Sequence, residues 1–211
     1  MADYPSRRGI VLWAVPFLGV LLWSAVNPKD YQVWALEVSP AVAGALIILF
    51  TRRRFPLTRL TYRLILVHAL ILIVGGHYTY AEVPLFDLLR EPLGFTRNNY
   101  DKLGHLAQGF VPAIVAREVL LRLSPLERGG WLNLLVVSLC LAISAFYELI
   151  EWWVALLSEQ AAESFLGTQG YVWDTQSDMG WALLGAVLAL VLLSRYHDSQ
   201  LREQGLAETH G

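Results

Sequence analysis

Long apolar runs broken by few polar residues dominate the chain. Six runs approach the roughly 20 residues that an α-helix needs to cross the hydrocarbon core of a bilayer, at about 10–26, 34–50, 60–79, 101–121, 131–153 and 173–194. The stretch 80–100 is rich in proline, glycine and asparagine, so we expect a loop there with a short interfacial helix at 82–90. The pattern predicts an all-α membrane protein: a polytopic bundle of about six transmembrane helices, forming a single integral membrane domain over residues 1–211.

The composition agrees with a membrane protein. The chain is 55% hydrophobic and 16% charged, whereas an average soluble domain is about 25% charged. The net charge of −2 gives no broad basic face, so we expect membrane lipids and no nucleic acid as partners. The single cysteine, Cys140, lies inside an apolar run and is expected to be a packing residue. With one cysteine, neither an intramolecular disulfide nor a cysteine-based metal site can form.

The basic residues predict the orientation. If the N-terminus lies in the cytoplasm, 12 of the 16 basic residues fall on inner segments, and the four on outer segments are Lys29, Arg90, Arg97 and Lys102. Because cytoplasmic loops carry an excess of Lys and Arg, both termini are expected to be cytoplasmic. The first run follows Arg7 and Arg8, which also fits a cleavable signal peptide. However, no small-x-small cleavage site follows Ser24 and five more runs come after it, so we expect a retained helix.

Ionisable residues recur at the predicted outer ends of three spans. The fourth span begins with Asp101 and His105, the fifth closes with Glu148 and Glu151, and the sixth begins with Asp174 and Asp178. Within each pair the spacing of three or four residues places both side chains on one stripe of a helix. Charges inside a bilayer are costly and usually mark a site. We therefore expect the three stripes to face one another.

The chemistry of such a cluster has several solutions. Carboxylates that are close together in a low dielectric need a cation, a bound proton or a basic partner, and Lys102 and Arg97 could neutralise some of them. Asp and Glu oxygens with one imidazole suit a divalent metal such as Zn, Mn or Fe, so a metal set of Asp101, His105, Glu148 and Asp178 is predicted. Alternatively, one carboxyl keeps a proton and acts as a general acid or base. The candidate catalytic residues are Asp101, His105, Glu148, Glu151, Asp174 and Asp178, with Glu151 and Asp174 at the rim. The remaining alternative is purely structural: polar residues at helix ends that face water.

Other polar residues are weaker candidates. His77 could line the same cavity or belong to an interfacial aromatic belt. His68, in the middle of its span, is expected to be a hydrogen-bonded packing residue. Arg117 and Glu118 are expected to snorkel or to pair locally. The tail from His197 onward is polar and is expected to fray.

Three segments resemble the YjdF-type bacterial inner-membrane proteins, a family with a domain of unknown function. They are 75–84 (GGHYTYAEVP), 99–110 (NYDKLGHLAQGF) and 173–179 (WDTQSDM). The resemblance covers nearly the whole chain. It implies a bacterial inner-membrane location and supplies no activity.

A looser similarity is to VanZ-like membrane proteins, which are associated with glycopeptide (teicoplanin) resistance at the cell envelope. The residues that match their pattern are Asp101, Lys102 and His105, with Glu148 or Glu151. The last helix departs from it, because VanZ-like proteins carry an Asn followed by a Gly where this chain has Asp178, Met179 and Gly180.

Three classes of function fit this sequence. The first is a membrane-embedded enzyme acting on a lipid, lipid-linked or small-molecule substrate at the outer leaflet; no nucleophilic Ser, Cys or Thr motif is visible, which favours activated water or direct acid–base chemistry. The second is a proton- or cation-coupled transporter, although the charges lie near one face and no repeat is evident. The third is a non-catalytic membrane scaffold with a structural polar cluster.

Overall fold

The computed structural model describes residues 6–157 and 169–206, and in these parts of the chain the regular structure is entirely helical. The all-α prediction is confirmed. The helices are α1 (Arg7–Ser24), α2 (Tyr31–Thr51), α3 (Arg59–His77), α4 (Pro84–Arg90), α5 (Tyr100–Leu123), α6 (Gly130–Leu157) and α8 (Asp174–Glu203). The short α4 lies within the stretch 82–90 that was expected to form an interfacial helix.

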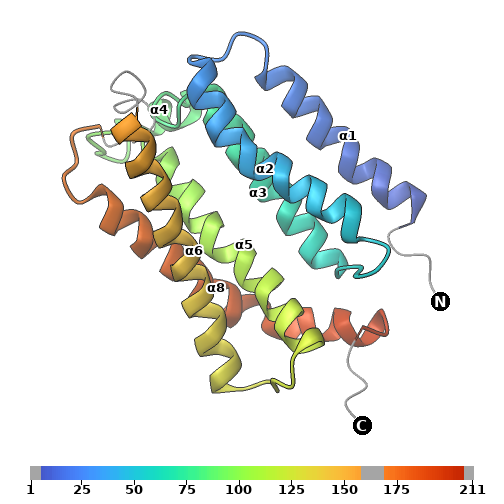
Figure 1. Ribbon diagram of the computed structural model, residues 1–211. Helices are drawn as coiled ribbons and strands as arrows, with labels where there is room; N and C mark the ends of the chain where they lie inside the picture. Colours follow the sequence, from blue (N-terminus) through green and yellow to red (C-terminus); the bar gives the residue numbers. More distant parts are fainter. Residues whose placement is uncertain (1–5, 158–168, 207–211) are drawn as a thin grey trace.

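Five of the described helices are long and apolar enough to cross a membrane: α1, α2, α3, α6 and α8. The remaining expected span, at 101–121, corresponds to α5, which has 24 residues and lies among the other long helices (Figure 1). Its sequence is more polar because it carries Asp101, Lys102, Arg117, Glu118 and Arg122. The first four of these side chains are buried, so α5 hides its charges from lipid by packing inside the protein.

Local sequence sets the starts of the first helices. The side chains of Ser6, Asp30 and Thr58 accept hydrogen bonds from backbone N–H groups in the first turns of α1, α2 and α3. Asp30 is the strongest of these caps, with its Oδ1 at 2.7 Å from Gln32 N and 3.0 Å from Val33 N. Such caps satisfy N–H groups that have no partner within the helix.

The long helices run roughly up and down between two ends of the bundle (Figure 1). The start of α1 and the end of α8 lie at one end, and α4 lies at the other (Figure 1). The helices α5 and α8 approach so closely that a Cβ at Gly109 would overlap the backbone of Ala182, and one at Gly185 would overlap the backbone of Leu106. Glycine allows this contact, as small residues commonly do where membrane helices cross.

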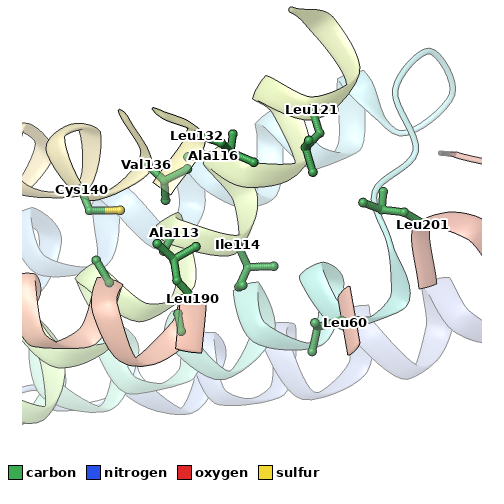
Figure 2. Packing of buried hydrophobic residues seen from close by; sticks show 12 residues of the cluster. Leu60, Ala113, Ile114, Ala116, Leu121, Leu132, Val136, Cys140, Leu190 and Leu201 are labelled. Carbon is green, nitrogen blue, oxygen red and sulfur yellow. The ribbon is translucent and has the colours of Figure 1, made fainter. Parts of the chain in front are cut away.

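Two apolar clusters hold the bundle together. The larger one joins α5, α6 and α8 to the start of α3 (Figure 2) and includes Leu60, Ile114, Leu132 and Cys140. Cys140 has no exposed surface, which confirms the packing role expected for it. The smaller cluster joins α1, α2 and α3 around Phe17, with Val38, Ala41, Ala69 and Ile73.

The expected frayed tail from His197 onward is wrong for its first turns. The helix α8 continues from the predicted end at residue 194 to Glu203. His197, Gln200 and Leu201 are buried, and Gln200 Oε1 accepts a hydrogen bond of 2.7 Å from Leu60 N in α3. Contacts with distant helices therefore hold a segment whose own sequence is polar.

A candidate carboxylate and histidine site

One residue from each of three helices meets at the end of the bundle where α5 and α8 begin and α6 ends. His105 of α5 lies with its Nδ1 3.9 Å from Glu148 Oε1 of α6 and its Nε2 3.8 Å from Asp178 Oδ2 of α8. One ligand atom of each residue lies within 4.8 Å of the other two. The predicted convergence of three polar stripes is therefore confirmed in its geometry, whereas the chemical roles of these residues stay a prediction.

Asp101 and Asp174 belong to a neighbouring ion-pair network. Arg97 Nη2 lies 2.5 Å from Asp101 Oδ2 and 2.8 Å from Asp174 Oδ1. Lys102 Nζ lies 2.9 Å from Asp174 Oδ1 and 2.5 Å from Asp178 Oδ1. The oxygens of Asp101, Asp174 and Asp178 also lie within 4.8 Å of one another, but two basic side chains already neutralise them. This geometry separates Asp101 from the metal set predicted with His105, Glu148 and Asp178.

Glu148 is the member of the site whose hydrogen bonding is incomplete. Its residue is 8% exposed, and its Oε1 has no hydrogen-bond partner within residues 6–157 and 169–206. Leaving a buried polar atom unpaired costs about 1–3 kcal/mol, and more when it is charged. A bound cation or a retained proton would remove this cost.

A cavity of about 180 Å³ is lined by His105 and Asp178 of this set. Its polar lining comes from five helices and the loop after α3, and comprises Glu37, His68, Thr79, Tyr80, Asp101, His105, Gln108, Tyr147, Glu151 and Asp178. Pro40, Leu72, Pro112 and Ile143 supply apolar surface. The volume exceeds by several-fold the roughly 10–15 Å³ that one water requires, so an ion with its waters would fit. Glu151, predicted at the rim, lies in this lining.

Sequence reasoning missed Glu37 and Tyr147. Tyr147 Oη donates a hydrogen bond of 2.9 Å to Glu37 Oε2, and Glu37 is 6% exposed. A single carboxylate inside the apolar run 34–50 was the signal that could have found this residue. Tyr147 gave no such signal, because it directly precedes Glu148 and its orientation depends on the packing of α6.

The two weaker histidine candidates, His68 and His77, have different surroundings. His68 lines the cavity, and its buried Nε2 has no hydrogen-bond partner in the described chain, so the expected hydrogen-bonded packing role is wrong for this atom. His77 instead bonds through Nδ1 to Ser24 O at 2.9 Å, and its ring centre lies 4.5 Å from that of Trp23 with the ring planes tilted by 36°. The aromatic-belt interpretation therefore fits His77, although its neighbours Thr79 and Tyr80 reach the cavity.

A second buried network lies toward the other end of α5. Glu118 is fully buried and accepts hydrogen bonds from Thr58 N at 2.9 Å, Thr61 Oγ1 at 2.7 Å and His197 Nε2 at 3.1 Å. Arg122, four residues on in α5, is a local partner at 2.8 Å. The expectation of snorkelling or purely local pairing is thus wrong for Glu118, because its other described partners lie at the start of α3 and on α8. The carboxylate is saturated with donors, which indicates a structural role.

Comparison with known proteins gives the family. Residues 9–199 match a family described as "Predicted membrane protein (DUF2238)". The chain belongs to this family. It is also 51% identical over 187 residues to "Inner membrane protein YjdF" of Escherichia coli (strain K12), across 89% of this chain and 90% of that protein. The YjdF-type resemblance and the inner-membrane location are thereby confirmed. No solved structure matches the chain significantly, and the similarity to VanZ-like proteins stays a prediction.

Proposed function

We propose that this membrane protein is a metal-dependent enzyme that acts on a lipid or lipid-linked substrate at the outer face of the membrane. The observation that carries the proposal is the set His105, Glu148 and Asp178, whose ligand atoms come from three helices and lie within 4.8 Å of one another. One imidazole and two carboxylates suit Zn, Mn or Fe. The Oε1 atom of Glu148 has no hydrogen-bond partner among the described residues, so it is available as a ligand for a cation.

The bound ion and the residues that line the cavity would together provide the groups that a hydrolytic reaction needs. His105, Glu148 and Asp178 would hold the divalent ion and leave positions open for water and substrate, and the ion would supply an activated water near neutral pH. Glu151 also lines this cavity, and we assign it the role of general base toward that water. Apolar surface from Leu72 and Ile143 fits a substrate with a hydrocarbon part.

The metal-bound form is tested by elemental analysis. The full chain is purified in mild detergent, incubated with Zn²⁺ or Mn²⁺ and desalted; we expect about one ion per chain, as in a three-ligand site. His105→Ala and Glu148→Gln should each lose the ion while thermal melting shows a folded protein. Glu91→Gln, an acid-to-amide change at an exposed position of the same end, is the matched control and should keep it. A wild-type chain without bound metal, or a Glu148→Gln variant that retains it, contradicts the proposal.

Proton-coupled transport is the second candidate, and one observation favours it. His68 lies in the middle of α3, lines the cavity, and carries a buried Nε2 without a partner in the described chain. Intramembrane histidines of this kind occur in proton relays. Proton flux into proteoliposomes that disappears in His68→Leu, in a chain that binds no metal, would favour the transporter over the enzyme.

We also propose that the site faces outward. The first residues of α1, the ends of α2 and α5 and the last residues of α8 lie at one end of the bundle (Figure 1). The segments at this end carry 12 of the 16 basic residues of the chain. Cytoplasmic segments are enriched in Lys and Arg, so this end and both termini belong in the cytoplasm, and His105, Glu148 and Asp178 belong near the outer face.

This orientation predicts a labelling pattern. After Cys140 is replaced by Ala, cysteines are introduced singly at Arg53, Leu126 and Glu91. In intact cells an impermeant thiol reagent should label the cysteine at position 91 and leave those at 53 and 126 unmodified, and all three should react after the membrane is permeabilised. Labelling at 53 in intact cells without labelling at 91 reverses the orientation.

A further inference from the structure

An apolar groove lies between α1 and α2, away from the polar site. Both helices pack against α3, and the space between them forms a cavity of about 370 Å³, about twice the volume of the polar one. Its wall includes Phe17, Leu21, Ala45 and Leu49. The polar atom of Trp13 in this wall is already satisfied, because Nε1 donates a hydrogen bond of 2.9 Å to Tyr62 O. The wall therefore suits a hydrocarbon chain.

The groove has a polar end at Arg52. Arg52 directly follows α2 and lines the cavity together with Gly9 in the first turn of α1. Its buried Nε has no hydrogen-bond partner, and no carboxylate forms an ion pair with it, among the residues that the structure describes. A guanidinium, which stays charged and can bond two phosphate oxygens at once, suits a phosphate group.

The length of the groove matches one leaflet of a bilayer. The lining residues of α1 extend from Gly9 to Leu21, which at 1.5 Å per residue is about 18 Å. Half of a ~30 Å hydrocarbon core is about 15 Å. The exposed arginines Arg7, Arg8, Arg53 and Arg54 surround the polar end. Such clusters attract anionic headgroups in preference to zwitterionic ones.

We infer that the groove between α1 and α2 binds one anionic phospholipid, with an acyl chain along Phe17 and Ala45 and the phosphate on Arg52. This site is separate from the cavity at His105 and does not depend on the function proposed for it. The lipid would lie in the leaflet at the basic end of the bundle.

Native mass spectrometry of the full chain tests the inference. The protein in mild detergent is titrated with phosphatidylglycerol or with phosphatidylcholine carrying the same acyl chains. We expect a discrete adduct of one phosphatidylglycerol per chain that forms at about tenfold lower lipid concentration than the phosphatidylcholine adduct. Arg52→Gln should remove this tenfold preference, and Arg52→Lys should keep part of it. Ala45→Trp, which fills the groove, should weaken both adducts.

Two controls separate the groove from general electrostatic attraction. Arg53→Gln removes the same charge from an exposed neighbouring position, and Arg90→Gln removes it at the other end of the bundle. Arg90→Gln should keep the wild-type preference, and Arg53→Gln should reduce it by less than Arg52→Gln does. A thermal melt in each lipid gives a second readout, because phosphatidylglycerol should raise the Tm of wild type and not of Arg52→Gln. The inference is overturned if the two lipids bind equally, or if Arg52→Gln and Arg53→Gln lose the preference for phosphatidylglycerol to the same extent. A protein dimer that forms without lipid, with a second copy covering the groove, would overturn it as well.

Discussion

Replacing Lys102 by methionine is expected to lower the free energy of unfolding by about 3–5 kcal/mol, as breaking a buried ion pair typically does. The amine of Lys102 lies 2.9 Å from Asp174 Oδ1 and 2.5 Å from Asp178 Oδ1. All three residues are 8% exposed or less. Methionine fills a similar volume but removes the ammonium from both carboxylates. Asp174 keeps Arg97 at 2.8 Å, and Asp178 keeps the His105 ring at 3.8 Å. Unfolding by sodium dodecyl sulfate in mixed micelles, followed by circular dichroism, measures the loss.

The matched control is Lys29→Met. Lys29 pairs with Glu82 at 2.6 Å, but both side chains are more than half exposed. The hydrogen bond and the charge of Glu82 raise the pKa of Lys29, so the lysine is charged at neutral pH, yet exposed pairs contribute little to stability. This variant should unfold like wild type. Adding Asp178→Asn to Lys102→Met should recover part of the loss, because it removes one uncompensated charge; equal stability of Lys102→Met and Lys29→Met would contradict the assigned role.

Glu118→Ala should lower the free energy of unfolding by a similar amount, about 3–5 kcal/mol, because it removes the central acceptor of a buried ionic network. The Thr58 and Thr61 hydroxyls and the His197 ring would lose Oε2, the oxygen to which all three donate. Since these residues lie at the start of α3 and on α8, the variant should also speed amide hydrogen exchange in the first turn of α3. Hydrogen exchange read by mass spectrometry, together with detergent unfolding, measures both effects.

Glu127→Ala is the control for Glu118→Ala. Glu127 is exposed in the loop between α5 and α6, so its removal should change neither stability nor exchange. Glu118→Gln keeps an acceptor oxygen of the same reach and should lose less than Glu118→Ala. If Glu118→Ala matches Glu127→Ala, the network around Glu118 does not fasten α3 to α8.

The sequence predicted the long helices well because each depends on the length of a local apolar run, and the first three also on a local cap. The start of α2 follows from Asp30, and that of α3 from Thr58, which can be identified without knowledge of the rest of the fold. The end of α8 could not be predicted in this way. The polar residues around His197 form a helix because Glu118, 79 residues earlier in the chain, accepts a hydrogen bond from the imidazole.

In the candidate site, too, the sequence predicted the local pattern but not the contacts between helices. Periodicity indicated that Asp101, His105, Glu148 and Asp178 would lie on facing stripes. It could not assign partners within the cluster, since Asp101 and His105 share a stripe on α5 but differ in neighbours: Asp101 contacts Arg97, and His105 faces Glu148 and Asp178. The pairing depends on the rotation and depth of three helices, and periodicity along one helix reports neither.

The charges of α5 bear on the order in which the protein enters the membrane. Lys102 is neutralised by Asp174 and Asp178, Glu118 is bonded by His197, and all three of these partners lie on α8. The ribosome synthesises α5 before α8. An isolated helix whose charged side chains have no partner partitions poorly into lipid. Stable insertion of α5 therefore waits for α8, so a nascent chain that stops before Asp174 should keep α5 accessible to water and to proteases.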